Sequence, residues 1–289
     1  MADPTPATDE PSQPQAPGFS RKNLIWIGVI TAAVWAFAVS TGSRVLLIIV
    51  GVLTVVLAAL MIWAFRKIKQ QRGLINLLQG AADSPDARRA ALAKLDAAKD
   101  ASAPTNVFAR AQLLAADDPK AALALIEPVD LKTFPAAMQD DVALLKTQLY
   151  LGLGRTADAR KAADTMNLDN PQRKEVRAMA ASIVAEAWAR TGKPKEALAL
   201  LDSIELPSKN GEQIALQARV AKVFAKFAAN QRGPARTELA ALADIDINQL
   251  GRFVMPQFRV HPELQKLARQ VLERHPSARK MVKANAKGR

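Results

Sequence analysis

The sequence predicts an all-α protein in which a transmembrane helical hairpin precedes an α-solenoid of about four to five helix pairs. Two apolar stretches without a charged residue, both near the N-terminus, predict the hairpin. Beyond residue 72, the abundance of Ala, Leu, Lys, Arg and Gln and the scarcity of β-branched runs favour helices. A motif that recurs at nearly constant intervals in this region predicts that the helices stack as repeated pairs.

Residues 1–20 are predicted to be a disordered tail. They contain five prolines, and they carry Asp3, Asp9 and Glu10 without a single base. Such a segment has too little apolar surface to offset the entropic cost of folding.

Residues 21–72 are predicted to form the membrane anchor. Residues 24–40 and 45–65 are uncharged, and only a short turn with Arg44 separates them. At ~1.5 Å rise per residue they extend roughly 26 and 32 Å, close to the ~30 Å thickness of the hydrocarbon core. One alternative is that Ala36, Phe37 and Ala38 form a cleavage site, which would make residues 1–38 a signal peptide. The acidic leader and the second span favour the hairpin.

Basic residues flank the hairpin on one side of the membrane. Because positive charge is retained in the cytoplasm, both termini and the helical region are expected to be cytoplasmic, at a bacterial inner membrane. The flanking bases are also expected to contact anionic lipid headgroups. They are Arg21, Lys22, Arg66, Lys67, Lys69 and Arg72.

Residues 104–245 contain four related units, and residues 73–103 are predicted to form a linking helical pair before them. A small residue recurs at Ala122, Ala159, Ala197 and Ala235, at spacings of 37, 38 and 38 residues. It would allow the second helix of each unit to approach the first closely. One helix pair cannot bury its apolar faces alone, whereas stacked pairs can.

These units resemble the tetratricopeptide repeat family over roughly residues 104–245. An aromatic residue, a glycine, an alanine and a closing proline are spaced as in that family, and the next unit repeats the first three. The matching residues are Tyr150, Gly154, Ala159 and Pro171, followed by Trp188, Gly192 and Ala197. Asp117 and Asn230 stand where the family has its turn glycine, and the period exceeds the usual ~34 residues. Membership of another α-solenoid family therefore stays open.

The resemblance implies a groove lined by the first helices of successive units. Its mixture of apolar and polar side chains would suit an extended or helical peptide. The residues expected to face it are Leu144, Gln148, Met179, Ser182, Glu186, Arg190, Gln217, Val220 and Phe224. The alternative is that several of them, Met179 and Phe224 in particular, belong to the core between repeats.

The C-terminal region departs from the repeat. Pro256, Pro262 and Pro276 divide residues 246–276, which are predicted to form capping helices. Residues 277–289 form a basic tail without an acid, either a solubilising tail or one that contacts headgroups, acidic proteins or RNA.

The composition excludes several kinds of chemistry. Without cysteine there are no disulfides, thiolate metal sites or thiol nucleophiles, and with only His261 and His275 a multi-histidine metal centre is excluded. We therefore expect no catalytic residues, no metal site and no cofactor, and a protein that is not an enzyme. The net charge of +13 comes mainly from the flank of the hairpin and the C-terminal tail, which weakens a nucleic-acid role.

The predicted function is that of a membrane-anchored protein-interaction scaffold, which recruits or assembles partner proteins at the inner membrane through the helical-repeat groove. Its partners would be the lipid bilayer and one or more proteins or peptides. In the alternative, the hairpin itself shapes membrane or forms a homo-oligomer, and the solenoid regulates it. Small residues that would permit close helix contact support that alternative. They are Gly28, Ala32, Ala36, Gly51, Ala58 and Ala59.

Overall fold

The computed structural model describes residues 84–205 and 211–276. The chain divides into two units, Met1–Ile75 and Asn76–Arg289, and every described residue belongs to the second. The predicted tails (1–20 and 277–289) and the predicted spans (24–40 and 45–65) lie outside the described residues. So do the bases expected at the headgroups, Arg21, Lys22, Arg66, Lys67, Lys69 and Arg72. None of the helices in the described ranges has the length and apolar character needed to cross a membrane.

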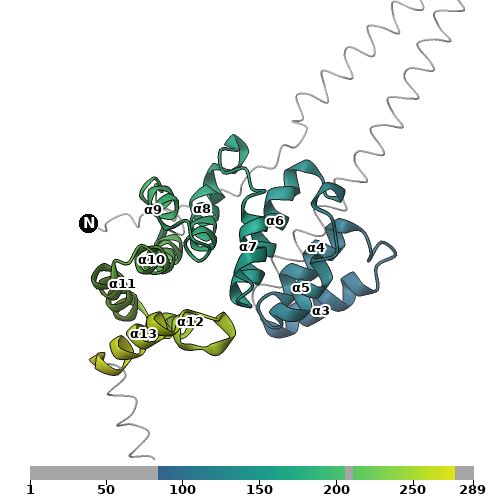
Figure 1. Cartoon of the computed structure of the whole chain (residues 1–289). Coiled ribbons are helices and arrows are strands. Elements are labelled where there is room, and N and C mark those ends of the chain that lie inside the picture. Colours follow the sequence, from purple (N-terminus) through teal and green to yellow (C-terminus); the bar gives the residue numbers. More distant parts are fainter. Residues whose placement is uncertain (1–83, 206–210, 277–289) are drawn as a thin grey trace, which may run out of the picture. The chain divides into compact units, whose positions relative to one another are not determined.

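All regular structure in the described ranges is helical, which confirms the all-α class for this part of the chain (Figure 1). The α-helices are α3 (Pro85–Asp96), α4 (Pro104–Leu114), α5 (Pro119–Ile126), α6 (Ala136–Gly152), α7 (Thr156–Ala163), α8 (Lys174–Ala189), α9 (Pro194–Asp202), α10 (Gly211–Ala228), α11 (Arg232–Ile245), α12 (Gly251–Val254) and α13 (Pro262–Arg274). Four 3-10 helices connect them: η1 (Leu131–Thr133), η2 (Pro171–Arg173), η3 (Ile247–Leu250) and η4 (Pro256–Phe258).

Helices α4 to α11 form four consecutive pairs in which the two members pack against each other: α4 with α5, α6 with α7, α8 with α9, and α10 with α11. The second members begin at Pro119, Thr156, Pro194 and Arg232, at spacings of 37, 38 and 38 residues. The spacing between the four alanines in the sequence thus recurs between the starts of the second helices. Helix α3 packs against α4, and the helix expected before it lies outside the described residues.

The turns within the last three pairs share one geometry. Gly154, Gly192 and Asn230 have φ angles of +70°, +86° and +59°, in the left-handed region. The amide of the following residue then donates to the carbonyl five residues back, at 2.8, 3.0 and 2.8 Å, as in a Schellman cap. Asn230 can replace glycine here because asparagine tolerates this conformation better than most residues.

The turn of the first pair differs, because Asp117 is not among the described residues with a positive φ. Instead the neighbouring Asp118 caps α5, and its carboxylate accepts hydrogen bonds from the amides of Lys120 and Ala121 at 3.1 and 3.0 Å. Aspartate favours this N-cap role since its oxygen satisfies amides that the first helical turn leaves unpaired.

The recurring small residue lies in the core of every pair. Ala122, Ala159, Ala197 and Ala235 are fully buried, as expected for close approach of the paired helices. The buried side chains form two neighbouring clusters, one around α4 to α8 and the other around α8 to α13. Burial of apolar surface, at about 25 cal/mol per Å², is the main stabilising contribution of both.

The C-terminal segment, residues 246–261, does more than cover the last pair. Helix α13, which follows this segment, packs against α11. Between these two helices, however, Leu250 and Phe253 are fully buried in the core that includes α8 and α10. Helix η4 then reaches α6, in the second pair. The segment therefore connects the second, third and fourth pairs.

Polar contacts at equivalent positions link successive pairs. The Tyr150 hydroxyl donates to Glu127 at 3.2 Å, and Trp188 Nε1 donates to Asp164 at 2.9 Å. Each bond joins the aromatic residue of one pair to the C-terminal end of the second helix of the preceding pair. Arg155 also binds Glu127 through both terminal nitrogens, at 3.1 and 2.7 Å.

The Glu127–Arg155 contact predicts an acid-sensitive contribution to stability. Hydrogen bonds from Arg155 hold the pKa of Glu127 below its ordinary value. A lowered pKa in the folded state stabilises the protein above the unfolded-state pKa, about 4.3, and the gain is lost as the pH falls through the folded-state pKa. We expect Arg155→Gln to reduce the free energy of unfolding at pH 7 by at most about 1 kcal/mol, since the pair is partly exposed.

The measurement is urea unfolding of the wild-type and Arg155→Gln chains between pH 7 and pH 3. The difference between them should shrink as the pH falls below about 4.3. Arg236→Gln, at an exposed arginine of α11, is the control for loss of one positive charge. A difference between wild type and Arg155→Gln that stays constant down to pH 3 would contradict the assignment.

Candidate interaction site around Glu186

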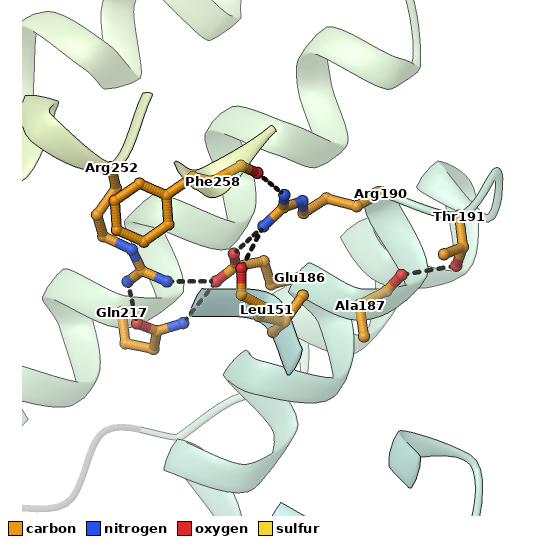
Figure 2. A network of polar contacts seen from close by, with 8 residues as sticks. All are labelled: Leu151, Glu186, Ala187, Arg190, Thr191, Gln217, Arg252 and Phe258. Carbon is orange, nitrogen blue, oxygen red and sulfur yellow. Dashed lines mark hydrogen bonds and ion pairs between the residues drawn. The ribbon is translucent and has the colours of Figure 1, made fainter. Parts of the chain in front are cut away.

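A buried polar network joins α8, α10 and the C-terminal segment (Figure 2). Glu186 and Arg190 lie one turn apart, at the C-terminal end of α8, and so share one face of that helix. Gln217 lies on α10, which packs against α8. Arg252, on α12, completes the network from the C-terminal segment.

Glu186 is the centre of this network. Its Oε1 accepts a hydrogen bond from Arg190 Nη1 at 3.3 Å. Its Oε2 accepts from Gln217 Nε2 at 3.0 Å and from Arg252 Nη2 at 2.9 Å. Arg252 Nη1 also donates to Gln217 Oε1 at 2.7 Å, which closes a ring of contacts (Figure 2). Both carboxylate oxygens of Glu186 are thus satisfied by groups that fix their positions.

Arg190 extends the network to the second helix pair. Its Nη2 donates to the carbonyl of Phe258 in η4 at 2.5 Å, and its Nη1 lies 3.4 Å from the carbonyl of Leu151 in α6 (Figure 2). Its guanidinium carbon lies 4.8 Å above the ring of Phe224. A single side chain therefore contacts α6, α8, α10 and η4.

The network carries more positive than negative charge. Glu186 is 1% exposed and the side chains of Arg190 and Arg252 are 6% and 28% exposed. Burial lowers the pKa of Arg190 and Glu186 opposes that shift, but an arginine stays protonated in a protein. Two guanidinium groups thus share one carboxylate, and Arg252 is the more exposed of the two arginines.

No protein-family model, curated protein or solved structure matches this chain. The functional argument therefore depends on the site itself.

The structure brings together four of the nine residues expected in the groove. Glu186, Arg190 and Gln217 belong to the network, and Phe224 lies against it, 5.0 Å from the ring of Phe253. These side chains contact the chain's own C-terminal segment. Whether they also bind a partner stays a prediction.

The other five expected groove residues divide by exposure. Ser182 and Val220 are fully buried, and the Ser182 hydroxyl donates to the carbonyl of Ala178 within α8 at 2.8 Å. Leu144 and Met179 are partly buried, and Gln148 is exposed. The alternative of a core position thus holds for Val220 and Phe224, and Leu144 and Met179 also pack against the core around α4 to α8. Gln148 is the member of the set most open to solvent.

Sequence analysis missed the contribution of Arg252 and Phe258. They lie in a segment interpreted as a cap for the end of the stack, and no repeat or spacing connects them to α6 or α8. Leu250 and Phe253, three residues apart, indicate one apolar face in this segment, and both are fully buried. Their spacing does not identify the helices that this face contacts.

Within residues 84–205 and 211–276, no group of three His, Asp or Glu side chains is placed to hold a metal ion. A cavity of about 430 Å³ lies between α8 and α9, away from Glu186. Its lining mixes apolar residues with both charges, among them Lys174, Arg177, Leu200, Ile204 and Glu205. The polar network, in which Glu186 fixes two arginines from different elements, is suited to positioning side chains.

Proposed function

We propose that the chain is a membrane-anchored scaffold that recruits or assembles partner proteins at the bacterial inner membrane through a tetratricopeptide-like α-solenoid. The observation that carries the proposal is the register of the four helix pairs, whose second members start at spacings of 37, 38 and 38 residues. Repeated pairs present an extended surface to which each unit adds contacts, a property suited to holding partners.

The accessible part of the expected groove supports a partner site toward the second and third pairs. Gln148 is exposed, and Leu144 lies one turn before it on the same face of α6. Met179, on α8, is also partly exposed. This mixture of a polar side chain with apolar neighbours suits a peptide that docks by shape and by a few hydrogen bonds.

The anchor would confine this binding to the membrane. Residues 24–40 and 45–65 would span the bilayer, with both termini and the helix pairs in the cytoplasm. Tethering would raise the effective concentration of captured partners for one another without any catalysis. Neither a cofactor nor a chemical reaction is part of the proposal.

Site-specific photo-crosslinking in intact membranes tests this function. A photoreactive amino acid at Gln148 is expected to give discrete adducts with other proteins, because this side chain is exposed beside the expected partner site. The same amino acid at Lys195, exposed on α9, is the matched control and should give few adducts. Equal adducts at both positions, or capture of the same partners by a chain without residues 104–245, would contradict the proposal.

A further inference from the structure

The C-terminal segment is held firmly at two points and loosely between them. Phe253, on α12, and Val260, after η4, are 0% and 6% exposed and belong to the core around α8 to α13. Residues 255–259 lie between them, and four of these five residues are exposed. Phe258 is the exception, since its side chain packs against the same core. We call residues 255–259 the η4 loop.

Few contacts attach the η4 loop to the helix pairs. Arg190 donates to the backbone carbonyl of Phe258 at 2.5 Å (Figure 2). The stem of the Arg259 side chain lies against the turn at Gly154. No side chain of the loop forms a hydrogen bond or an ion pair with another helix in the described part of the chain. Detaching the loop therefore breaks one charged hydrogen bond and the packing of one aromatic ring, while both buried anchors stay in place.

The loop is strained where it lies against Gly154. The φ and ψ angles of Arg259 are both 47°, in the left-handed region, which disfavours most residues roughly tenfold. The amide of Arg259 donates only within the loop, to the carbonyl of Pro256 at 3.0 Å. Because a detached loop is free to leave this conformation, the strain opposes the attached state. Backbone strain of this kind is typical of segments that switch.

The loop lies at one end of the groove proposed to bind partners. Helix η4 contacts α6, on which Gln148 and Leu151 are three residues apart and so are neighbours on the helix surface. The carbonyl of Leu151 lies 3.4 Å from Arg190 Nη1, and Arg190 is itself one of the residues expected to face the groove. A peptide that extends from Gln148 toward Arg190 would therefore meet the η4 loop.

We propose that the η4 loop is an autoinhibitory latch of the partner groove. In the closed state Arg190 holds the carbonyl of Phe258. In the open state the same guanidinium binds a backbone carbonyl of an extended partner peptide, a group of identical chemistry. The partner shifts the equilibrium because it binds only the open state. The inference rests on the proposed function, since it concerns the regulation of the same groove.

The alternative is that the loop only braces the fold. A brace holds α6 and α8 in the geometry that a partner recognises, so opening it would reduce partner binding. A latch competes with the partner, so opening it increases partner binding. The two roles thus differ in the sign of one effect.

Two replacements of Arg259 separate the closed from the open state with the same change in charge. Arg259→Asn supplies a residue that tolerates the left-handed conformation, whereas Arg259→Val supplies a β-branched residue for which a positive φ is an outlier. We expect the ratio of open to closed chains to be about tenfold higher with Arg259→Val than with Arg259→Asn.

Thiol labelling of the full chain in detergent measures the opening. The chain contains no cysteine, so Phe258→Cys introduces a single thiol at the position that the closed loop packs against the core. In this background the labelling rate, divided by that of the same chain unfolded in urea, should be about tenfold higher with Arg259→Val than with Arg259→Asn. Circular dichroism and the unfolding midpoint must show that each variant is folded.

Photo-crosslinking at Gln148 in intact membranes measures the consequence for partners. The adduct yield with Arg259→Val should be about three- to tenfold above that with Arg259→Asn, since apparent affinity scales with the open population. Gly154→Ala, whose added Cβ would meet the stem of Arg259, should raise labelling and adduct yield as well. Gly192→Ala, at the equivalent turn without such a contact, is its control and should raise neither. If Arg259→Val does not fold, the glycine pair gives the same comparison.

Equal labelling of the open and closed variants would show that the loop does not open and would overturn the inference. Faster labelling with an unchanged or lower adduct yield would identify a brace and would overturn it too. In both cases discrete adducts at Gln148 leave the scaffold function standing. If none of the chains gives adducts, the open variants included, the scaffold function fails and the latch fails with it.

Discussion

Replacing Glu186 with glutamine is expected to reduce the free energy of unfolding by about 3 kcal/mol, near the lower end of the range for breaking a buried ion pair. The carboxylate is 1% exposed and accepts hydrogen bonds from Arg190, Gln217 and Arg252. An amide at this position keeps the size of the side chain but removes the only acid of the network. Two guanidinium groups would then be left in a site that excludes most water.

The measurement is urea unfolding of the full chain in detergent, followed by circular dichroism. Glu273→Gln, at an exposed position of α13, is the control and should change stability by less than about 0.5 kcal/mol. A Glu186→Gln/Arg252→Gln chain should lose less stability than the sum of its two single replacements, because the groups belong to one network. A loss below about 1 kcal/mol for Glu186→Gln would show that the network is not stabilising.

Replacing Gly154 with alanine is expected to cost about 3 kcal/mol, the combined effect of a left-handed backbone and an overpacked contact. The φ angle of Gly154 is +70°, and a Cβ there would lie 2.8 Å from Cγ and 2.9 Å from Cβ of Arg259. Those atoms belong to the ordered base of the side chain, so either η4 or the turn after α6 must move.

Gly192 is a matched control for this replacement within the same chain. It occupies the equivalent turn with a φ angle of +86°, but an added Cβ would meet no atom within 4 Å. Gly192→Ala should therefore cost only the backbone contribution, about 1–2 kcal/mol. Arg259→Gly should recover much of the difference between the two alanine variants. Equal losses at Gly154 and Gly192 would contradict close packing between η4 and the turn.

Local features of the described fold could be predicted from sequence because they depend on neighbours in the chain. The interval between Ala122, Ala159, Ala197 and Ala235 indicated the helix pairs, and all four side chains are buried. The interval is kept in the two turns that lack the glycine. In the last pair Asn230 adopts the left-handed conformation, and in the first pair Asp118 caps a turn of different geometry. Because the unit is repeated, each such position can be recognised in more than one unit of the sequence.

The site was predictable only in part, because half of it comes from outside the repeat. The resemblance to tetratricopeptide repeats implied that Glu186, Arg190 and Gln217 face one groove, and these three side chains do converge. Their partners Arg252 and Phe258 lie more than thirty residues beyond Gln217 in the chain and have no counterpart in earlier units. A single sequence contains no signal for such distant contacts, since they depend on how the segment turns back after α11.

The return of residues 246–261 to α6 also bears on how this domain evolves and unfolds. Arrays in which each unit meets only its neighbours can gain or lose a unit and can melt from one end. Here Arg190 ties Leu151 to Phe258, a sequence separation of 107 residues. Excising one helix pair would displace the contact of residues 246–261 with α6, so the number of helix pairs is constrained. The pairs from α6 onward are expected to unfold as one cooperative block.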